Sequence, residues 1–293
     1  MKNNDFYRLT EGFKEWLGIM GYVQSSIETM PRRVNKFFIF LQKQKVYEIS
    51  QIKRKHIEQF YSKLKTTKSK QTGELLKNST LNGTNRILRL FTHYLEETGQ
   101  GQLTIDIPYE KKEPPEREIL TLGEIKALYN EVDETILGLR DRAMLNIYYG
   151  CGLRSKEGIS LDLKDVMTDK NLVYVRKGKQ YRERYVPFTY KQKKDFEIYL
   201  KSCRKRLVKD QEQQSFLVNN KGKRISSTAL HKRLKVLSKT AGINKTVGLH
   251  MLRHSIATHL MQSGMKIEDI ATFLGHKNIE STQRYTHLSI ENG

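Results

Sequence analysis

The chain has 293 residues, which is enough for two ordinary domains or one large one. Its 53 Lys and Arg outnumber its 32 Asp and Glu, and the resulting formal net charge of +21 favours a polyanionic partner. Two cysteines without paired spacing indicate neither a disulfide framework nor a thiolate zinc site. The sequence contains no secretory signal and no membrane-spanning run, so we expect a soluble protein of the reducing cytoplasm.

The distribution of charge predicts two basic domains. Residues 1–100 carry a net charge of +9, residues 101–117 of −1, and residues 118–293 of +13. Three of the five prolines, Pro108, Pro114 and Pro115, fall in the neutral stretch, and proline stiffens a linker and blocks helix continuation. We therefore expect a helical domain over 1–104, a linker over 105–117 and a second domain over 118–293, both gripping one polymer.

Apolar residues recur at helical spacing through the first domain. They predict helices over about 6–17, 27–41 and 79–97, and a third helix that Ser50 caps and that runs to about residue 64. Basic residues gather at this third helix and in the polar loop that follows it. As candidate contacts to nucleic-acid phosphates we take Lys53, Arg54, Lys55, Lys63, Lys65, Lys68 and Lys70.

The second domain is predicted to be mainly α-helical with a small β-sheet. Thr121 and Glu124 form a capping box, and further helices are expected over about 136–149 and just after Arg154. The β-rich segments 171–176 and 184–188 flank a polar turn and predict a hairpin. Helices follow over about 190–207, 226–241, 250–263, 266–275 and 279–288.

Two arginine-containing segments carry the chemistry. Arg154 follows Gly152 and Leu153 at a predicted helix start, where an anion is favoured. Arg253 lies one turn after His250, so the two side chains project from one helix face. The rigid donor fork of arginine matches a phosphate and stays protonated. A tyrosine hydroxyl near such a grip, as at Tyr285, is suited to attack a phosphodiester and retain its bond energy.

Other residues in these segments have further expected roles. A lysine on the hairpin turn is suited to protonate the leaving oxygen, and Lys179 is preferred over its competitor Lys177. Glu157 is expected to hold Arg154 or the start of its helix in place. A metal site at His250 and His254 is disfavoured because Met251 stands where a zinc protease carries Glu, so His254 is assigned a supporting role.

Taken together, these motifs resemble the tyrosine recombinases of the phage-integrase and Xer-like family. Gly-Leu-Arg154 with Glu157 resembles the first arginine box, and residues 178–184 before Val186-Pro187 resemble the β-hairpin lysine motif. The second box is matched by His250-Met-Leu-Arg253-His254 and Leu274-Gly-His276. Tyr285 stands nine residues after His276, in the position of the nucleophile of the family. Lys156 and Gln180 depart from the family pattern, but neither replaces a catalytic group.

The resemblance implies a helical core-binding (SAM-like) domain and a mixed α/β catalytic domain that form a C-shaped clamp on DNA. It implies four protomers at synapsis, no metal and no nucleotide cofactor, and it leaves room for an accessory or directionality protein. The implied catalytic residues are Arg154, Lys179, His250, Arg253, His276 and Tyr285. Lys177, Arg182 and Arg284 are further candidate DNA contacts. Eight residues follow Tyr285, a short segment for exchange with a neighbouring subunit.

These features predict a site-specific recombinase that cuts and rejoins DNA through a 3′-phosphotyrosine. Such an enzyme serves integration, excision, inversion or dimer resolution, and no arm-binding domain is expected before the helical one. Two alternatives stay open at this point. One is a type IB topoisomerase-like enzyme, and the other is a DNA-binding accessory protein without catalysis. A metal-dependent nuclease is a third class, and it would lose its activity in chelator.

Overall fold

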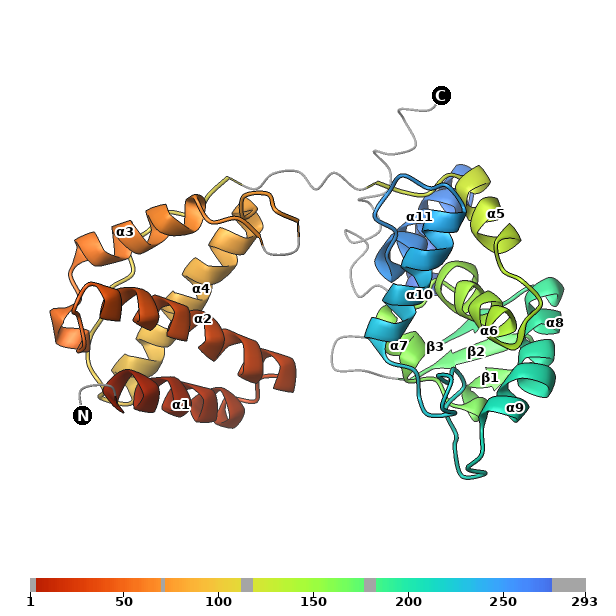
Figure 1. The fold of residues 1–293 in the computed structure, drawn as a ribbon, viewed down its shortest axis with the longest axis horizontal. Coiled ribbons are helices and arrows are strands. Elements are labelled where there is room, and N and C mark those ends of the chain that lie inside the picture. Colours follow the sequence, from red (N-terminus) through yellow and green to blue (C-terminus); the bar gives the residue numbers. More distant parts are fainter. Residues whose placement is uncertain (1–3, 70–71, 112–117, 177–182, 276–293) are drawn as a thin grey trace. The chain divides into compact units, whose positions relative to one another are not determined.

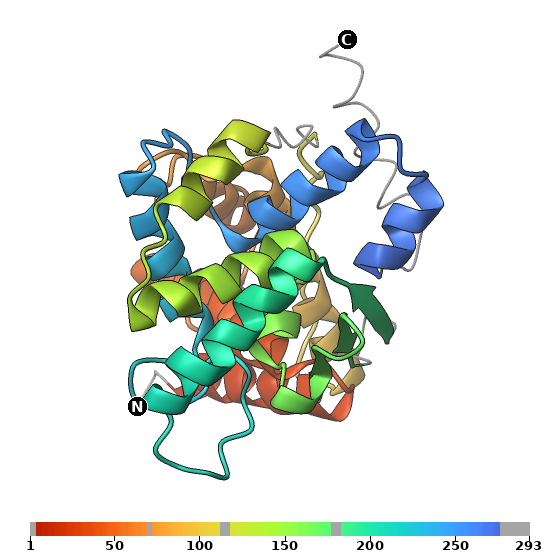
Figure 2. The same ribbon diagram turned by 90° about the vertical axis from the view of Figure 1, so that its right-hand side faces the viewer.

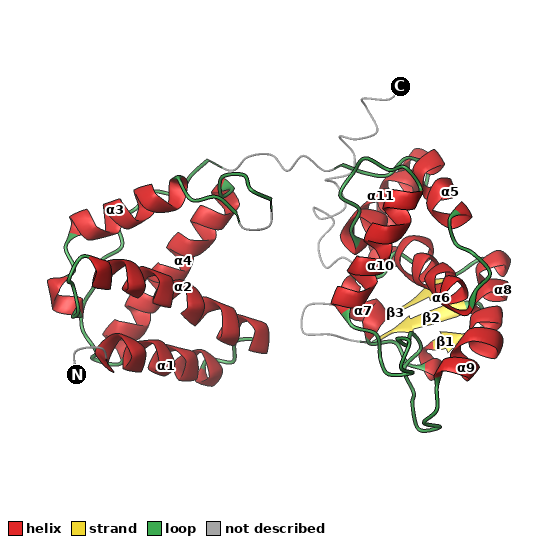
Figure 3. Ribbon diagram, in the orientation of Figure 1, coloured by secondary structure: helices red, strands yellow, loops and turns green. Residues whose placement is uncertain are grey.

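A computed structural model describes residues 4–69, 72–111, 118–176 and 183–275. The chain divides into two compact units, Met1–Glu116 and Arg117–Gly293, and each is described by itself. Helices dominate both units, and the single three-stranded sheet of the described chain lies in the second (Figures 1 and 3). The predicted fold class, mainly α with a small β-sheet, is confirmed. None of the described helices is long and apolar enough to span a membrane.

The first unit is helical. Its elements are α1 (Asn4–Ile19), α2 (Gln24–Lys43), the 3₁₀ turn η1 (Ile49–Gln51), α3 (Arg54–Lys65) and α4 (Asn78–Glu97). The apolar faces of the helices meet in an aromatic core, in which Phe13, Phe37 and Phe91 are fully buried. The predicted start of the third helix was wrong. Ser50 lies in η1, and α3 starts after Lys53, whose backbone N–H donates to Nδ1 of His56 at 3.1 Å.

The chain that follows α4 belongs to the first unit for longer than expected. Ile105 and Ile107 are buried in its core. The side-chain amide of Asn85 donates to the Ile107 carbonyl at 2.8 Å, and that of Asn82 donates to the Glu110 carbonyl at 2.9 Å. The expected linker therefore begins later than residue 105, because alternating apolar residues dock this segment along α4.

The second unit mixes helices with the small sheet. Its α-helices are α5 (Leu122–Asn130), α6 (Ile136–Leu145), α7 (Ser155–Ile159), α8 (Tyr190–Ile198), α9 (Lys205–Leu207), α10 (Ser227–Thr240), α11 (Leu249–Gln262) and α12 (Ile267–Leu274). A π-helical turn, η2 (Asn146–Gly150), follows α6, and another, η4 (Tyr199–Arg204), joins α8 to α9. The capping box predicted at Thr121 is present, with two hydrogen bonds of 2.7 and 3.1 Å to Glu124.

The sheet is antiparallel in the order β1-β2-β3. The strands are β1 (Val166–Met167), β2 (Leu172–Val175) and β3 (Arg184–Pro187), and β1 follows the short 3₁₀ helix η3 (Leu163–Asp165). Val173 faces Val186 across the predicted hairpin, and both are fully buried. The two-residue strand β1 was not predicted, because it is too short to show an alternating pattern.

The packing of α11 and α12 in the second unit positions the candidate site. Helices α6 and α8 lie side by side and cover the core beside the sheet (Figures 1 and 2). Helix α11 packs against η2, so that it faces the segment leading to α7. Helix α12 packs against both α11 and β3 and ends at Gly275, whose positive φ of 65° is a left-handed helix end. The carboxyl end of α12 therefore lies where α7, α11 and β3 converge.

Candidate active site

A buried carboxylate, Glu157, organises the site. It lies on α7, three residues after Arg154, and its side chain is 4% exposed. The Arg154 guanidinium donates to Glu157 Oε1 at 2.7 Å, and the Arg154 backbone N–H donates to Oε2 at 2.8 Å. Glu157 was expected to hold Arg154 or the start of its helix, and it contacts both the Arg154 side chain and the backbone N–H of Arg154 directly before α7.

Arg253 reaches the same place from α11. Its guanidinium lies 3.8 Å from Glu157 Oε2 and donates to the carbonyls of Gly152 and Leu274. Arg154 also donates to the Leu274 carbonyl, at 3.4 Å, and to that of Gly275, at 3.3 Å. The structure thus brings together the two arginines that the sequence places in separate boxes. They meet at the carboxyl end of α12, where unpaired carbonyls attract cations.

A third arginine, Arg184 at the start of β3, completes the cluster and was given no role from the sequence. It donates to both oxygens of Glu157, at 3.3 and 3.0 Å, and its Nε donates to the Phe273 carbonyl at 2.9 Å. The signal that could have revealed it is the strand period. Arg184 shares the inward face of β3 with the fully buried Val186, and a buried arginine requires a partner.

The electrostatics of the cluster suit an anion. Burial alone would raise the pKa of Glu157, but hydrogen bonds and charge from Arg184, and then hydrogen bonds from Arg154, hold that pKa at about 2. The carboxylate is therefore ionised at neutral pH. Among the described residues, three guanidinium groups face this one carboxylate. The remaining positive charge makes this a place for a phosphate.

His250 lies on the outer side of the cluster, at the first turn of α11. Its side chain is exposed, yet partial desolvation and then the charges of Arg253 and Arg154 lower its pKa, so the ring is neutral at pH 7. The His254 ring stacks on it with centroids 5.9 Å apart, in agreement with a supporting role. His259, one turn further along α11, pairs instead with the Tyr149 hydroxyl at 2.9 Å.

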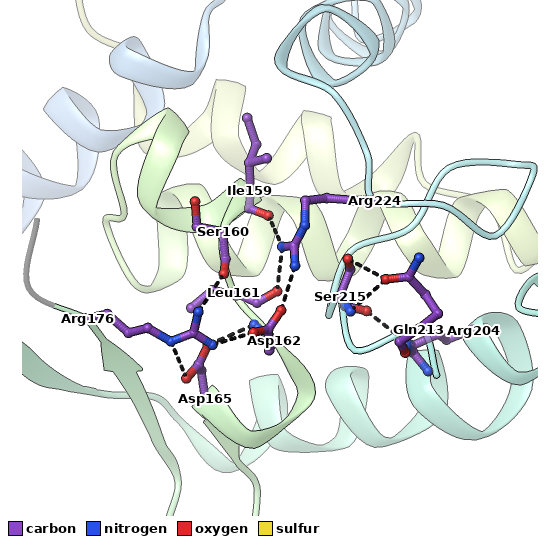
Figure 4. A network of polar contacts seen from close by, with 10 residues as sticks. All are labelled: Ile159, Ser160, Leu161, Asp162, Asp165, Arg176, Arg204, Gln213, Ser215 and Arg224. Carbon is purple, nitrogen blue, oxygen red and sulfur yellow. Dashed lines mark hydrogen bonds and ion pairs between the residues drawn. The ribbon is translucent and has the colours of Figure 1, made fainter. Parts of the chain in front are cut away.

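A second polar network lies at the end of β2 (Figure 4). Asp162 accepts from Arg176, the residue after β2, and from Arg224 in the segment before α10, both at 2.6 Å. Arg176 also pairs with both oxygens of the buried Asp165 in η3. Close by, Arg204 donates to the Ser215 carbonyl at 2.9 Å and so holds the segment between α9 and α10 beside the Asp162 network. The carboxyl end of β2 is thus tied to the chain that follows α7.

The described candidate phosphate contacts on α3 lie at its two ends. Lys53, Arg54 and Lys55 lie at the start of α3 and Lys63 and Lys65 at its end, about 15 Å apart for a helix rising 1.5 Å per residue. All five are exposed, as is Lys68 in the following loop. Surface ion pairs join Arg54 to Glu58 at 2.8 Å and Lys65 to Glu110 at 2.6 Å. Exposed pairs of this kind are weak enough to exchange for phosphate contacts.

Several predicted site residues lie outside the described part of the chain. They are Lys70, Lys177, Lys179, Arg182, His276, Arg284 and Tyr285. Four of the predicted catalytic and supporting residues, Arg154, Glu157, His250 and Arg253, lie in or beside one cluster. The backbone carbonyls that two of them grip belong to the residues directly before His276.

The arginine cluster is chemically suited to an anion such as a phosphate, and comparison with known proteins specifies the class of protein. Residues 118–292 match the Phage integrase family. The chain is 29% identical over 289 residues to tyrosine recombinase XerC 2 of Ralstonia nicotianae. The aligned region covers 97% of this chain and 82% of that relative. Tyrosine recombinase XerD of Listeria innocua is 34% identical over 208 residues, 69% of each chain.

Solved structures share the fold. XerH recombinase bound to its difH substrate superposes with a TM-score of 0.72 at 22% identity, covering 91% of this chain and 78% of XerH. The Tn1549 transposon integrase in complex with a circular intermediate DNA gives a TM-score of 0.73 at 16% identity, with 97% and 99% covered. The chain therefore belongs to the phage integrase family. It is a tyrosine-type site-specific DNA recombinase, an enzyme that breaks and rejoins DNA strands.

Proposed function

We propose that Tyr285 is the nucleophile of this recombinase and that the arginine cluster binds the scissile phosphate. The phenol of Tyr285 gives up its proton to solvent, and its oxygen bonds to phosphorus while the bond from phosphorus to the 5′-oxygen breaks. This leaves a 3′-phosphotyrosine and a strand with a free 5′-hydroxyl. Lys179 gives its proton to the departing oxygen, with Lys177 as the competing donor. The 5′-hydroxyl of the partner strand then attacks the phosphotyrosine, so the bond energy is kept without a metal or nucleotide cofactor.

Arg154, Arg253, His250 and His276 surround the non-bridging oxygens in this proposal. These oxygens gain charge in the transition state, and preorganised donors stabilise it more than the ground state. The observation that carries the proposal is the meeting of Arg154 and Arg253 at Glu157 and the Leu274 carbonyl. Only Gly275 separates Leu274 from His276 in the sequence, so the same backbone leads to the next proposed catalytic group.

The proposed partner is double-stranded DNA carrying a specific core recombination site, bound by four protomers at synapsis. Support comes from the net charge of +21 and from the solved relatives, which include XerH bound to difH and the Tn1549 integrase bound to DNA. We assign the first unit to core-site binding and the second to catalysis. Lys53, Arg54, Lys55, Lys63, Lys65, Lys68, Lys70, Lys177, Arg182 and Arg284 are the proposed DNA contacts.

The biological setting is proposed on the same grounds. Xer recombinases are bacterial relatives of this chain, and we place it in the bacterial cytoplasm, associated with the nucleoid. An accessory or directionality protein is a further proposed partner. The chemistry is common to integration, excision, inversion and dimer resolution.

Covalent trapping tests the proposed mechanism. The protein is mixed with supercoiled plasmid that carries the DNA flanking its own gene, in the presence of chelator, and the reaction is quenched in detergent. DNA that stays attached is sequenced. We expect attachment at one or two defined sites, its loss in Tyr285→Phe, and its loss in Arg154→Met with DNA binding retained. Scattered attachment would point to a topoisomerase-like activity, and tight binding without attachment to an accessory role.

A further inference from the structure

Arg184 ends the segment 178–184 that resembles the β-hairpin lysine motif, but the sequence assigned it no catalytic or DNA-binding role. Its side chain is 6% exposed, whereas that of Arg154 is 17% exposed. Its Nε donates to the Phe273 carbonyl, and its Nη1 and Nη2 donate to the Glu157 carboxylate. These hydrogen bonds engage every nitrogen of the Arg184 guanidinium, which points to a function through the groups that it holds.

Those groups belong to three separate parts of the proposed site. Arg184 itself opens β3, the second strand of the hairpin. It shares both carboxylate oxygens of Glu157 with Arg154, so the carboxylate is gripped from two sides. Its Nε fixes the Phe273 carbonyl near the end of α12, next to the carbonyl of Leu274 that Arg154 and Arg253 hold. One guanidinium thus ties the hairpin, the first arginine box and α12 together.

The packing around Arg184 leaves little freedom. A Cβ atom built on Gly275 would lie 2.7 Å from Arg184 Nη1, so the backbone passes close against the guanidinium. The positive φ of Gly275 and the absence of its side chain therefore both serve this approach. A lysine at position 184 keeps the charge but has no planar fork, and it cannot bond Glu157 and Phe273 with the same geometry.

We propose that Arg184 is a positioning residue for strand cleavage, which orients Arg154 through Glu157 and fixes the end of α12 that leads to His276. The proposal rests on the proposed function of the arginine cluster. Removal of Arg184 leaves DNA binding intact and misplaces the groups that grip the transition state. A misplacement of about 1 Å can cost a rate factor of about 100, and we expect a loss of that size in Arg184→Met.

The experiment measures single-turnover formation of the covalent complex, DNA affinity and melting temperature in the full-length protein. Arg184→Met is compared with Arg184→Lys and with Arg233→Met. The last is a matched control, because Arg233, like Arg184, pairs with a buried carboxylate that has a second arginine partner. That carboxylate is Asp141, and its second partner is Arg140 at 3.2 Å. We expect Arg184→Met to lose cleavage while binding DNA normally and Arg184→Lys to recover part of the rate. Arg233→Met is expected to melt earlier but to cleave like wild type.

A second substrate distinguishes two ways in which Arg184 could act. It could orient Arg154 and α12, or it could help the hairpin lysine to protonate the leaving oxygen. Replacing the 5′-bridging oxygen by sulfur gives a leaving thiol with a pKa of about 8.5, which departs without a general acid. This substrate should restore cleavage in Lys179→Ala, the proposed general-acid variant, but not in Arg184→Met. Sulfur rescue of Arg184→Met would overturn the route through Glu157 and α12, because the defect would then lie in protonation by the hairpin.

The remaining outcomes are distinct. Wild-type protein that forms no Tyr285-dependent attachment would refute the proposed function itself. If Arg184→Met cleaves at the wild-type rate, only the role of Arg184 is refuted. The same holds if Arg184→Met loses no more cleavage than Arg233→Met at an equal loss of melting temperature. If Arg184→Met does not fold, Arg184→Lys decides alone: a folded variant with normal affinity and normal cleavage rejects the proposal.

Discussion

Glu157→Gln is the perturbation with the most quantitative expectation. The Glu157 carboxyl has an ordinary pKa of 4.5 and a pKa of about 2 in the folded protein. Each tenfold change in proton affinity is worth about 1.36 kcal/mol, so ionisation of this group stabilises the second unit by about 3 kcal/mol at neutral pH. Breaking a buried ion pair by removing one partner typically costs about 3–5 kcal/mol. We therefore expect Glu157→Gln to lower the free energy of unfolding by about 3 kcal/mol at pH 7.

The pH dependence has a definite sign. A depressed carboxyl pKa stabilises the folded state above the unfolded-state value of 4.5, and the contribution is lost as pH falls towards about 2. Wild-type protein should therefore lose more stability than Glu157→Gln over this range. The single tryptophan, Trp16, lies in the core of the first unit and does not report on the second. Hydrogen exchange of the β2 and β3 amides is the suitable assay.

Glu124→Gln serves as the control. Glu124 pairs with Lys245 at 2.8 Å in a partly exposed position, and pairs of this kind are worth about 1 kcal/mol or less. Glu124→Gln is expected to change the free energy of unfolding by about 1 kcal/mol or less. An equally small change in Glu157→Gln would contradict the expected role of the Glu157 ion pairs. That role is also contradicted if wild type and Glu157→Gln lose stability in parallel between pH 4.5 and 2.

Three further predictions follow from the geometry. The His250 ring should titrate below pH 6.5 in NMR spectra. Because the folded state then binds fewer protons than the unfolded state, this group lowers the stability of the protein as pH falls below 6.5. A midpoint at or above 6.5 would contradict the lowered pKa. Gly275→Ala should melt earlier and cleave more slowly than Gly264→Ala. Both positions have positive φ, but only at Gly275 does the added methyl meet Arg184, so equal behaviour of the two variants in melting and cleavage assays would exclude that contact. Burial raises the pKa of the Cys151 thiol to about 12, so mass spectrometry should show no alkylation of Cys151 at pH 8 until the protein unfolds.

Local sequence patterns predicted much of this protein. The helical period placed α1, α2 and α4 within a few residues of their bounds, and the capping box at Thr121 began α5 as expected. These features depend on neighbours three or four residues away, which the sequence contains. The box motifs also placed Arg154 and Arg253 in one family pattern, and their meeting at Glu157 agrees with it.

Contacts between distant segments were decided only by the tertiary structure. In the sequence, Arg184 is one residue of a predicted strand, and only the packing of α12 and α7 gives it its partners. The partners of Asp162 also lie far from it along the chain. Burial turned each of these charged groups from a solvated side chain into one that requires a specific partner. The sequence by itself determined which residues could grip a phosphate, because side-chain chemistry is local. Packing alone determined which residue holds them in place, because a buried charge takes its partner from whatever segment the fold brings beside it.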